Sequence, residues 1–150
     1  NGYGDFFVFL YFGVIASFGT VFLQTNDYYY ASFLIGCIAG CLNVALLVVN
    51  NLRDVKEDSI SNKKTLIVKF GIFFGKLEFM FMIIAPYFIL YQLLFLLKRQ
   101  IFYYGYFSLF AFGVFMIYKI FMSRSFLIKK ALKYLSIYMI LLTVLLAFNL

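Results

Sequence analysis

Two acidic residues four positions apart, Asp54 and Asp58, follow directly on a long apolar run and are the strongest candidates in this sequence for metal-ion chemistry. Residues at this spacing on a helix have Cβ atoms about 5–6 Å apart, so two carboxylates there repel each other unless they share a cation. Mg²⁺ is typically bound by one or two carboxylates together with the phosphates of a substrate. Asn50, one turn before Asp54, adds a neutral oxygen ligand. The pattern therefore predicts that Asp54, Asp58 and Asn50 hold Mg²⁺ against a diphosphate.

Two basic residues beside the acidic pair, Arg53 and Lys63, can neutralise phosphate oxygens. Asn62 favours a tight turn just before Lys63, because Asn tolerates left-handed backbone geometry. A simpler interpretation stays open at this point, in which residues 53–58 form a solvated charged loop with surface ion pairs. A D-x-x-x-D pattern is a weak signal by itself, and from spacing alone the solvated loop is the more common case.

The composition indicates that the elements carrying these residues lie in a membrane. Hydrophobic residues make up 65% of the 150, aromatic residues 23%, and the mean hydropathy is +0.98, whereas a soluble domain is roughly half apolar. The chain has no His, which excludes Ser-His-Asp and Cys-His nucleophile systems and His-ligated metals within it. The net charge of +7 lies in short segments between apolar runs, which is the membrane pattern and not that of a nucleic-acid-binding face.

Five apolar segments are long enough to cross a bilayer, which takes about 20 mostly apolar residues. We therefore expect residues 1–150 to form one all-α transmembrane domain, a multi-pass helical bundle. Between the second and third spans lies a polar segment from Asn50 to about Lys69. Pro86 lies inside the third span and is expected to kink it. The expected spans are Phe6–Gln24, Ala31–Val49, a segment within Ile72–Leu97, Ile101 to about Met122, and about Ala131 to Leu150.

The basic residues predict the topology, because cytoplasmic loops of membrane proteins are enriched in Lys and Arg. Placing the segment Asn50–Lys76 in the cytoplasm puts eleven of the thirteen basic residues on that side and leaves only Lys98 and Arg99 outside. The acidic pair would then face the cytoplasm, with the amino end of the chain inside and its carboxyl end outside. The eleven residues are Arg53, Lys56, Lys63, Lys64, Lys69, Lys76, Lys119, Arg124, Lys129, Lys130 and Lys133.

The second span carries the packing signals. Gly36 and Gly40 form a G-x-x-x-G pattern that allows close approach of another helix. Asn43 lies deeper in the same span and is expected to face the bundle interior, as intramembrane polar residues usually do. Asn43 also falls on one helical face with Asn50, Asp54 and Asp58. The cysteines at 37 and 41 are best explained as small apolar residues of this helix.

Two longer patterns strengthen the metal-site interpretation. The segment Asn50–Asp58, N-N-L-R-D-x-x-x-D, followed by Lys63–Gly71, K-x-T-L-x-V-K-F-G, resembles the second aspartate-rich region of the UbiA-type intramembrane prenyltransferases. Phe18–Thr25 resembles the helix end that precedes this region. Within the family the chain is most similar to the 1,4-dihydroxy-2-naphthoate prenyltransferases of menaquinone synthesis. The resemblance covers about Phe6–Gly71, and beyond it only the hydropathy pattern agrees.

The chain departs from the family pattern in two respects. The family usually has Gly where Asn62 stands here. The family also has nine membrane helices and a first motif, N-x-x-x-D-x-x-x-D, in its amino-terminal half, and this chain resembles only the last five helices. We therefore expect the chain to be a fragment without that half, and to be inactive as a transferase by itself.

The resemblance implies an enzyme that transfers a polyprenyl group from its diphosphate to an aromatic acceptor, with Mg²⁺ as cofactor. It implies metal ligation by Asp54, Asp58 and Asn50, diphosphate binding by Lys63, Arg53 and Asn50, and catalytic roles for Asp54, Asp58 and Arg53. For the naphthoate branch the acceptor is dihydroxynaphthoate and the product demethylmenaquinone. The expected location is the bacterial inner membrane, with lipid and no nucleic acid as a partner.

Two alternatives remain open from the sequence. One is another branch of the same family, acting on 4-hydroxybenzoate, haem or chlorophyll precursors. The other is a membrane protein without enzymatic activity, such as a transporter fragment. A transporter should carry polar residues at midplane in several spans, and Asn43 is nearly the only such residue in this sequence.

Overall fold

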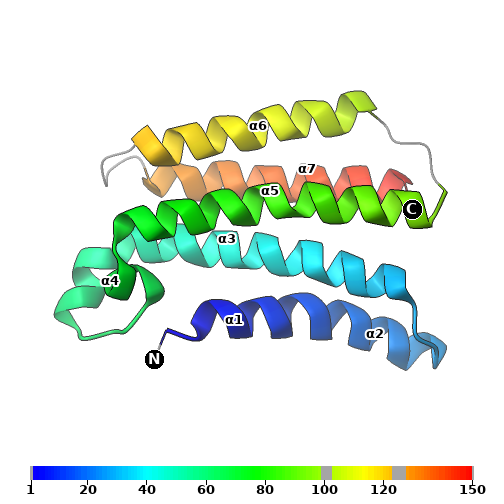
Figure 1. Ribbon diagram of the computed structural model, residues 1–150, viewed down its shortest axis with the longest axis horizontal. Coiled ribbons are helices and arrows are strands. Elements are labelled where there is room, and N and C mark those ends of the chain that lie inside the picture. Colours follow the sequence, from blue (N-terminus) through cyan, green and yellow to red (C-terminus); the bar gives the residue numbers. More distant parts are fainter. Residues whose placement is uncertain (1, 99–102, 123–127, 150) are drawn as a thin grey trace.

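The computed structural model of the chain describes residues 2–98, 103–122 and 128–149, and all regular elements in these ranges are helical. The helices lie side by side in an elongated bundle, and the first and last described residues are at opposite ends of it (Figure 1). This arrangement confirms the expected all-α bundle. The elements are α1 (Gly4–Val8), the π-helical segment η1 (Phe9–Ile15), α2 (Ala16–Thr25), α3 (Tyr30–Ile60), α4 (Leu66–Phe70), α5 (Ile72–Leu96), α6 (Tyr103–Met122) and α7 (Ile128–Asn149).

Five helices among the described residues are long and apolar enough to cross a membrane, as the sequence predicts. The first of them runs through α1, η1 and α2 without a break, so these three elements are called the first membrane helix below. Most of the expected bounds agree with the observed ones within a few residues. The exception is the second span, because α3 continues far past Val49. The five are Gly4–Thr25, Tyr30–Ile60, Ile72–Leu96, Tyr104–Met122 and Lys130–Phe148.

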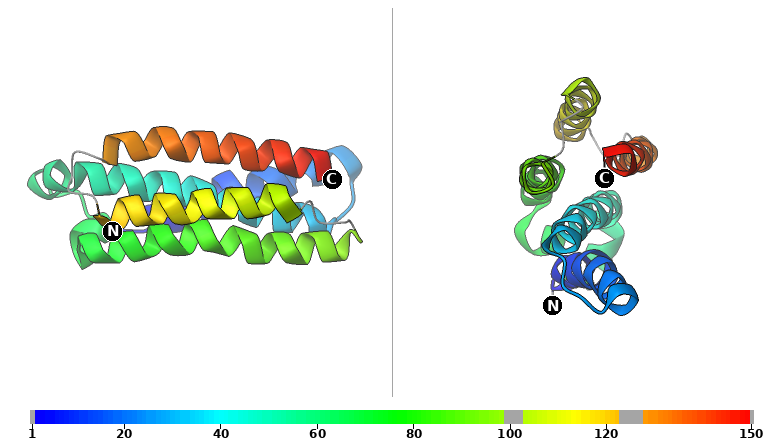
Figure 2. Two further views of the ribbon diagram at one scale, coloured as in Figure 1. Left: turned by 90° about the horizontal axis from the view of Figure 1, so that it is seen from above. Right: turned by 90° about the vertical axis from the view of Figure 1, so that its right-hand side faces the viewer.

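Helix α3 is the centre of the bundle. The first membrane helix packs on one side of it, and α5 and α7 pack on the other, with α6 resting on α5 and α7 (Figure 2). Val44, Ala45 and Val48 in the middle of α3 have no exposed surface. The first membrane helix is almost bare by comparison: 6% of its most apolar window is buried, against 61% for α3. All five long helices among the described residues are apolar, so apolarity does not explain this difference. A helix with more neighbouring helices simply has more of its surface buried.

Small residues allow the first membrane helix to cross α3 closely. A Cβ added to Gly13 would collide with the backbone of Gly40, and one added to Gly40 would lie 2.8 Å from the ring of Phe9. A Cβ added to Gly36 would lie 3.1 Å from the carbonyl oxygen of Gly13. Near this crossing the amide of Asn43 donates to the carbonyl oxygen of Ala39 at 3.0 Å and to that of Phe12, in η1, at 3.4 Å. The G-x-x-x-G pattern and the inward-facing Asn43 are thus confirmed as packing features.

The chain turns through asparagines at both ends of α3. Asn26, after α2, has φ 54°, and Asn62, after α3, has φ 55°. Asn62 takes the left-handed turn conformation expected from its type, which also explains why a glycine suits this position. Beyond it the hydroxyl of Thr65 accepts a hydrogen bond from the backbone N–H of Val68 at 3.2 Å and caps α4.

Helices α5 and α6 are tied at the end where the acidic pair lies. The ammonium group of Lys76, in the first turns of α5, donates to the backbone carbonyl of Phe121, near the end of α6, at 2.8 Å. Helix α5 then runs unbroken through Pro86. Cys37 and Cys41 are free and buried in α3, as expected. Arg99, Gln100 and residues 123–127 of the predicted basic loop lie outside the described residues.

Candidate active site

The acidic pair lies on the last turns of α3, which continues as a regular helix to Ile60. The helical spacing of Asn50, Asp54 and Asp58, on which the metal-site prediction depends, is therefore confirmed. The same helix crosses the bundle and presents these residues at its end, next to α4 and the start of α5 (Figure 1). Residues 53–58 are therefore helical and do not form a loop, although the alternative interpretation's surface ion pair is present between Arg53 and Asp54.

Asp54 is bound by its neighbour in the sequence. The guanidinium of Arg53 donates from Nε to Oδ1 at 2.6 Å and from Nη2 to Oδ2 at 2.7 Å, so both carboxylate oxygens are engaged. The two side chains are about one-third exposed, at 33% and 31%. Such forked pairs are among the stronger charge-assisted contacts. Arg53 is thereby placed beside a predicted metal ligand.

Asp58 is more deeply placed and is bound by Lys63. The residue is 7% exposed, and the ammonium group of Lys63 lies 3.1 Å from Oδ1 and 3.2 Å from Oδ2. The turn through Asn62 brings Lys63 back over the end of α3, where its backbone N–H also donates to the carbonyl oxygen of Asp58 at 2.9 Å. The structure thus brings together Asp58 and the lysine that the sequence assigns to the same site.

The remaining residues of the motif are placed differently. Asn50 is half-buried, one turn before Asp54, at the spacing expected of a third oxygen ligand. Lys56 and Glu57 are exposed, whereas Asp58 beside them is buried. Glu57 is therefore a natural control residue for experiments on the pair.

The residues fit part of a Mg²⁺ site. Carboxylate and amide oxygens are the ligands that Mg²⁺ prefers, and two carboxylates are sufficient when water and substrate phosphates complete the shell. Each carboxylate of the pair binds a cationic side chain in the structure, which is the environment of an ionised group that attracts positive charge. Within the described ranges no cluster of three or more His, Cys, Asp or Glu residues could hold a metal ion by itself. A diphosphate or further protein ligands would have to complete the shell.

A cavity beside the acidic pair was not foreseen from the sequence. It has a volume of about 460 Å³ and lies between the start of the first membrane helix, α3 and the turn before α4. Its polar lining includes Asp5, which is only 8% exposed and whose Oδ1 has no hydrogen-bond partner in the described part of the chain. The cavity is lined by Gly2, Tyr3, Gly4, Asp5, Phe7, Leu47, Asn51, Lys63, Lys64 and Thr65.

A sequence signal for Asp5 did exist. It is an acidic residue at the entrance of an apolar span, and such residues usually face a bundle interior or a cavity. Asn51 is next to a predicted ligand but lies about 100° around the helix from it, on the face toward the cavity. Lys64 was counted only as part of the basic cytoplasmic segment. These three residues were not recognised because their partners come from segments far apart in the sequence.

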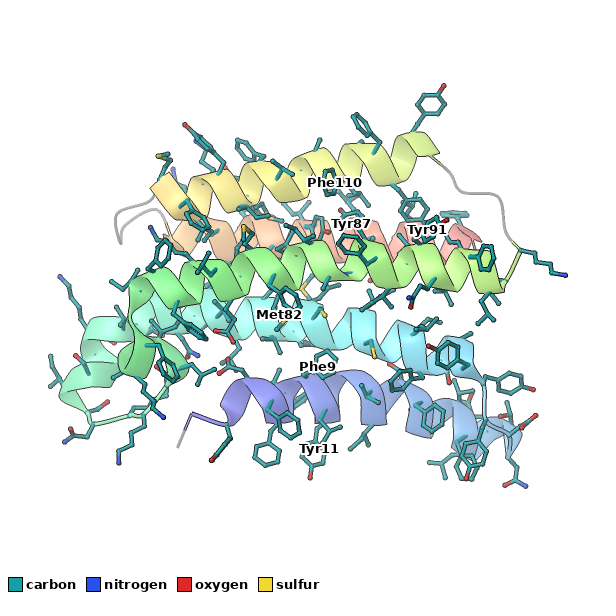
Figure 3. The ribbon with its side chains drawn as sticks, in the orientation of Figure 1. Phe9, Tyr11, Met82, Tyr87, Tyr91 and Phe110 are labelled. Carbon is teal, nitrogen blue, oxygen red and sulfur yellow. The ribbon has the colours of Figure 1, made fainter. Side chains whose placement is uncertain are left out.

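The aromatic side chains are divided between the interior and the outer surface (Figure 3). Tyr87 of α5 and Phe110 of α6 lie edge to face with ring centroids 5.1 Å apart, and the Tyr87 hydroxyl accepts a hydrogen bond from that of Tyr138 at 2.8 Å. Tyr11, in contrast, points away from α3 on the outer side of the first membrane helix and is 55% exposed. These aromatic residues are therefore in helix contact or available to lipid.

Comparison with known proteins adds independent information. The UbiA prenyltransferase family matches residues 1–140. Three curated relatives are named 1,4-dihydroxy-2-naphthoate octaprenyltransferase and are each 37% identical to this chain: over 71 residues in Mycobacterium leprae, 75 in Haemophilus influenzae and 70 in Escherichia coli. The matched segment is about half of this chain, 47–50%, and about a quarter of each relative, 23–24%. No solved structure matches the chain.

Proposed function

Because this chain belongs to the UbiA prenyltransferase family, we propose that it contributes a diphosphate-binding site to an enzyme that transfers a polyprenyl group to an aromatic acceptor. The observation that carries the proposal is the pair Asp54 and Asp58, one turn apart on α3, with the cationic groups of Arg53 and Lys63 on their oxygens. The two carboxylates suit a divalent cation, and the two cationic side chains suit an anionic substrate.

In the proposed reaction Asp54, Asp58 and Asn50 would hold Mg²⁺, which would supply Lewis-acid stabilisation of the diphosphate. Lys63 and Arg53, which lie on these carboxylates in the structure, would donate hydrogen bonds to phosphate oxygens. The negative charge that develops as the diphosphate departs is then stabilised by donors already in position. The chain's own contribution is to bind and orient the leaving group at the end of α3.

The proposed acceptor is 1,4-dihydroxy-2-naphthoate. The support for this choice is the printed name shared by the matched relatives. In this branch the prenyl group replaces the acceptor carboxylate, which leaves as CO₂ while diphosphate is released, and the direct product is the hydroquinone form of demethylmenaquinone. A 4-hydroxybenzoate, haem or chlorophyll precursor as acceptor would use the same diphosphate site, so the acceptor has to be tested separately.

The metal site proposed for these residues is incomplete without further ligands. Two carboxylates and one amide leave room for additional oxygens, and the first aspartate-rich motif of the family would supply them. We therefore expect the 150-residue chain alone to show no transfer with Mg²⁺ present. Turnover by the purified chain would show that the ligands present here are sufficient.

The cytoplasmic side of a bacterial inner membrane is the proposed location of the acidic pair. The support is the excess of basic residues on that side of the predicted topology. Three lysines lie at the same end of the bundle as Asp58. Lys63 pairs with Asp58 directly, Lys64 lies just before α4, and Lys76 lies in the first turns of α5. The labelling experiment described below tests this orientation.

The function is tested by following prenyl transfer from a polyprenyl diphosphate to dihydroxynaphthoate in the complete, reconstituted protein. Asp54→Ala and Asp58→Ala should each lower kcat by about 10²–10³, because each removes a preorganised contact to the developing charge. Glu57→Ala, on another face of the same turn, should keep activity within about threefold of the unmodified protein. Chelation of Mg²⁺ should abolish transfer reversibly. If all three variants keep normal turnover at limiting Mg²⁺, the proposed function fails.

A further inference from the structure

The outer surface of α4 and of the first turn of α5 is both apolar and basic. It consists of Lys69 and Phe70 at the end of α4 and of Ile72 and Phe73 in α5, all of which are exposed, and is called the α4 surface below. We propose that the α4 surface lies in the headgroup layer of the bilayer and binds an anionic phospholipid. The inference does not depend on the proposed function, because none of these residues belongs to the candidate active site.

The position of α4 along the bundle is the first observation. Helix α4 lies at one end, between the ends of α3 and α5 (Figure 1). The 25 residues of α5 extend about 38 Å at 1.5 Å per residue, whereas the hydrocarbon core of a bilayer is about 30 Å thick and the headgroup regions bring it to about 40–45 Å. The first turn of α5, and α4 just before it, therefore fall at the level of the headgroups.

Packing of the inner side of α4 is the second observation. Ile67 is 1% exposed, and a Cβ added to Gly75 of α5 would lie 2.7 Å from the side chain of Ile67 and 3.1 Å from that of Leu52 in α3. The inner side of α4 is thus fixed against two neighbouring helices. The exposure of Lys69 and Phe70 on the outside is consequently a feature of the fold and not of a loosely attached segment.

The apolar part of the α4 surface is unfavourable in water. Phe70 and Phe73 are 55% and 67% exposed, and Ile72 is 49% exposed. The cost of leaving apolar side chains in water rises with their exposed area. Phenylalanine and similar side chains at a membrane surface are instead buried at the boundary between headgroups and acyl chains. A lipid therefore covers these three side chains better than water does.

The charge of the α4 surface selects the kind of lipid. The ammonium group of Lys69 lies 5.0 Å from the centroid of the Phe70 ring, and Lys69 forms no ion pair with a residue in the described ranges. Residues 53–76 carry six basic and three acidic residues, and two of the acidic residues are already paired with basic ones. The remaining excess of positive charge attracts an anionic headgroup, with an effect of about fivefold in affinity for each basic residue near the membrane surface.

An anionic phospholipid matches the charged and the apolar parts together. Its headgroup pairs with Lys69, and its acyl chains cover Phe70 and Phe73. A soluble anion such as phosphate would match only the charge. An apolar helix of another protein would match only the aromatic side chains and would leave the ammonium group of Lys69 without a counter-ion.

The test measures lipid contact at position 73 of the complete protein, reconstituted in mixed phosphatidylcholine and phosphatidylglycerol bilayers. A fluorophore is attached to a cysteine replacing Phe73 in a variant without other cysteines, and quenching is measured with each lipid brominated in turn. Phosphatidylglycerol should bind at this position about fivefold more tightly than phosphatidylcholine, the effect of one basic residue. Lys69→Gln should remove this preference. Because Lys69 is exposed, its replacement leaves the packing of α4 intact.

Two controls are matched to this measurement. Lys98→Gln removes the same charge just beyond the other end of α5, and the preference at position 73 should not change. A cysteine replacing Val114, an exposed residue near the middle of α6, should be quenched equally by the two brominated lipids.

Three outcomes would overturn the proposal. Equal quenching by the two lipids at position 73 would show a surface in the bilayer without lipid selectivity. Quenching by neither lipid would show that water, a second copy or another part of the protein covers the α4 surface. A loss of preference in Lys98→Gln as large as that in Lys69→Gln would make the preference a property of the net charge and not of the α4 surface.

Discussion

The two ends of the bundle have the same kind of turn next to α3, but the polar groups around the two turns make different contacts. Each end of α3 is reached through an asparagine with positive φ, Asn26 at one end and Asn62 at the other. Around Asn26 the polar groups bond to their immediate neighbours, as when the Tyr28 N–H donates to Asp27 at 2.7 Å. Around Asn62 they bond over longer separations, or lie buried with no partner among the described residues, as Oδ1 of Asp5 does. Polar groups that local structure does not satisfy are found at the end where we propose that ligands bind.

The packing of the first membrane helix differs along its length. In η1, near the middle of the helix, a Cβ added at Gly13 would meet the backbone of α3, whereas nothing lies within 4 Å of a Cβ added at Gly19 in α2. Where the helix lines the cavity, a Cβ added at Gly4 would meet Leu47 at 3.9 Å, which is an ordinary contact. The closest packing is therefore at the crossing with Gly40 and not at the candidate active site.

The largest expected difference between the ends is their sidedness. On a variant without Cys37 and Cys41, a cysteine replacing Lys56 should react with a membrane-impermeant thiol reagent only from the cytoplasmic side. A cysteine replacing Asp27 should react only from the other side, because α3 separates the two positions. Labelling of position 56 from the outer side alone would reverse the proposed topology.

The next effect concerns a lysine at each end. Lys63→Met should lower kcat about a hundredfold, because it removes the cation on Asp58 and a donor to the diphosphate. Lys98→Met, at the far end of α5, removes the same charge where no site is proposed, and turnover should stay within about twofold. Transfer assays at saturating substrates measure both. Equal losses in the two variants would remove the functional contrast between the ends.

A smaller effect should appear when Gly13 and Gly19, two of the glycines of the first membrane helix, are replaced. Gly13→Ala forces η1 and α3 apart and should lower the free energy of unfolding by about 2 kcal/mol, a typical cost of overpacking. Gly19→Ala should be neutral or raise it by about 0.5 kcal/mol, because alanine favours the helix and meets no neighbour. Unfolding in mixed detergent micelles measures both. A Gly13→Ala protein as stable as the original would contradict the observed crossing.

The smallest effect should be the same at both ends. Asn26→Ala and Asn62→Ala should each lower the free energy of unfolding by about 1 kcal/mol, since left-handed backbone is unfavourable for alanine. Asn62→Gly should be tolerated. The same micelle unfolding assay applies, and a cost confined to one asparagine would show that the two turns are not equivalent.

Much of the fold followed from hydropathy, because five apolar runs separated by short polar segments leave few other arrangements. The turn at Asn62 followed from residue type, and the Asp54 and Asp58 spacing followed from the helical period. The cavity did not, because Asp5, Asn51 and Lys64 become neighbours only when the first membrane helix crosses α3. The ion pairs of Arg53 and Lys63 could not be predicted, because their geometry requires that α3 continues through Asp58. The sequence left both a helix and a loop open for residues 53–58. The metal and substrate roles of these residues stay predictions.

The length of α3 has a mechanical consequence. Its 31 residues extend about 46 Å at 1.5 Å per residue, whereas the hydrocarbon core of a bilayer is about 30 Å thick. The acidic pair thus lies on a continuous extension of a spanning helix, and no break in the helix separates the pair from the membrane-spanning part. A helix adapts to a thinner or thicker bilayer mainly by tilting. Any such tilt swings Asp54 and Asp58 through the same angle, so the lipid composition of the membrane and the height of the carboxylates above it are coupled.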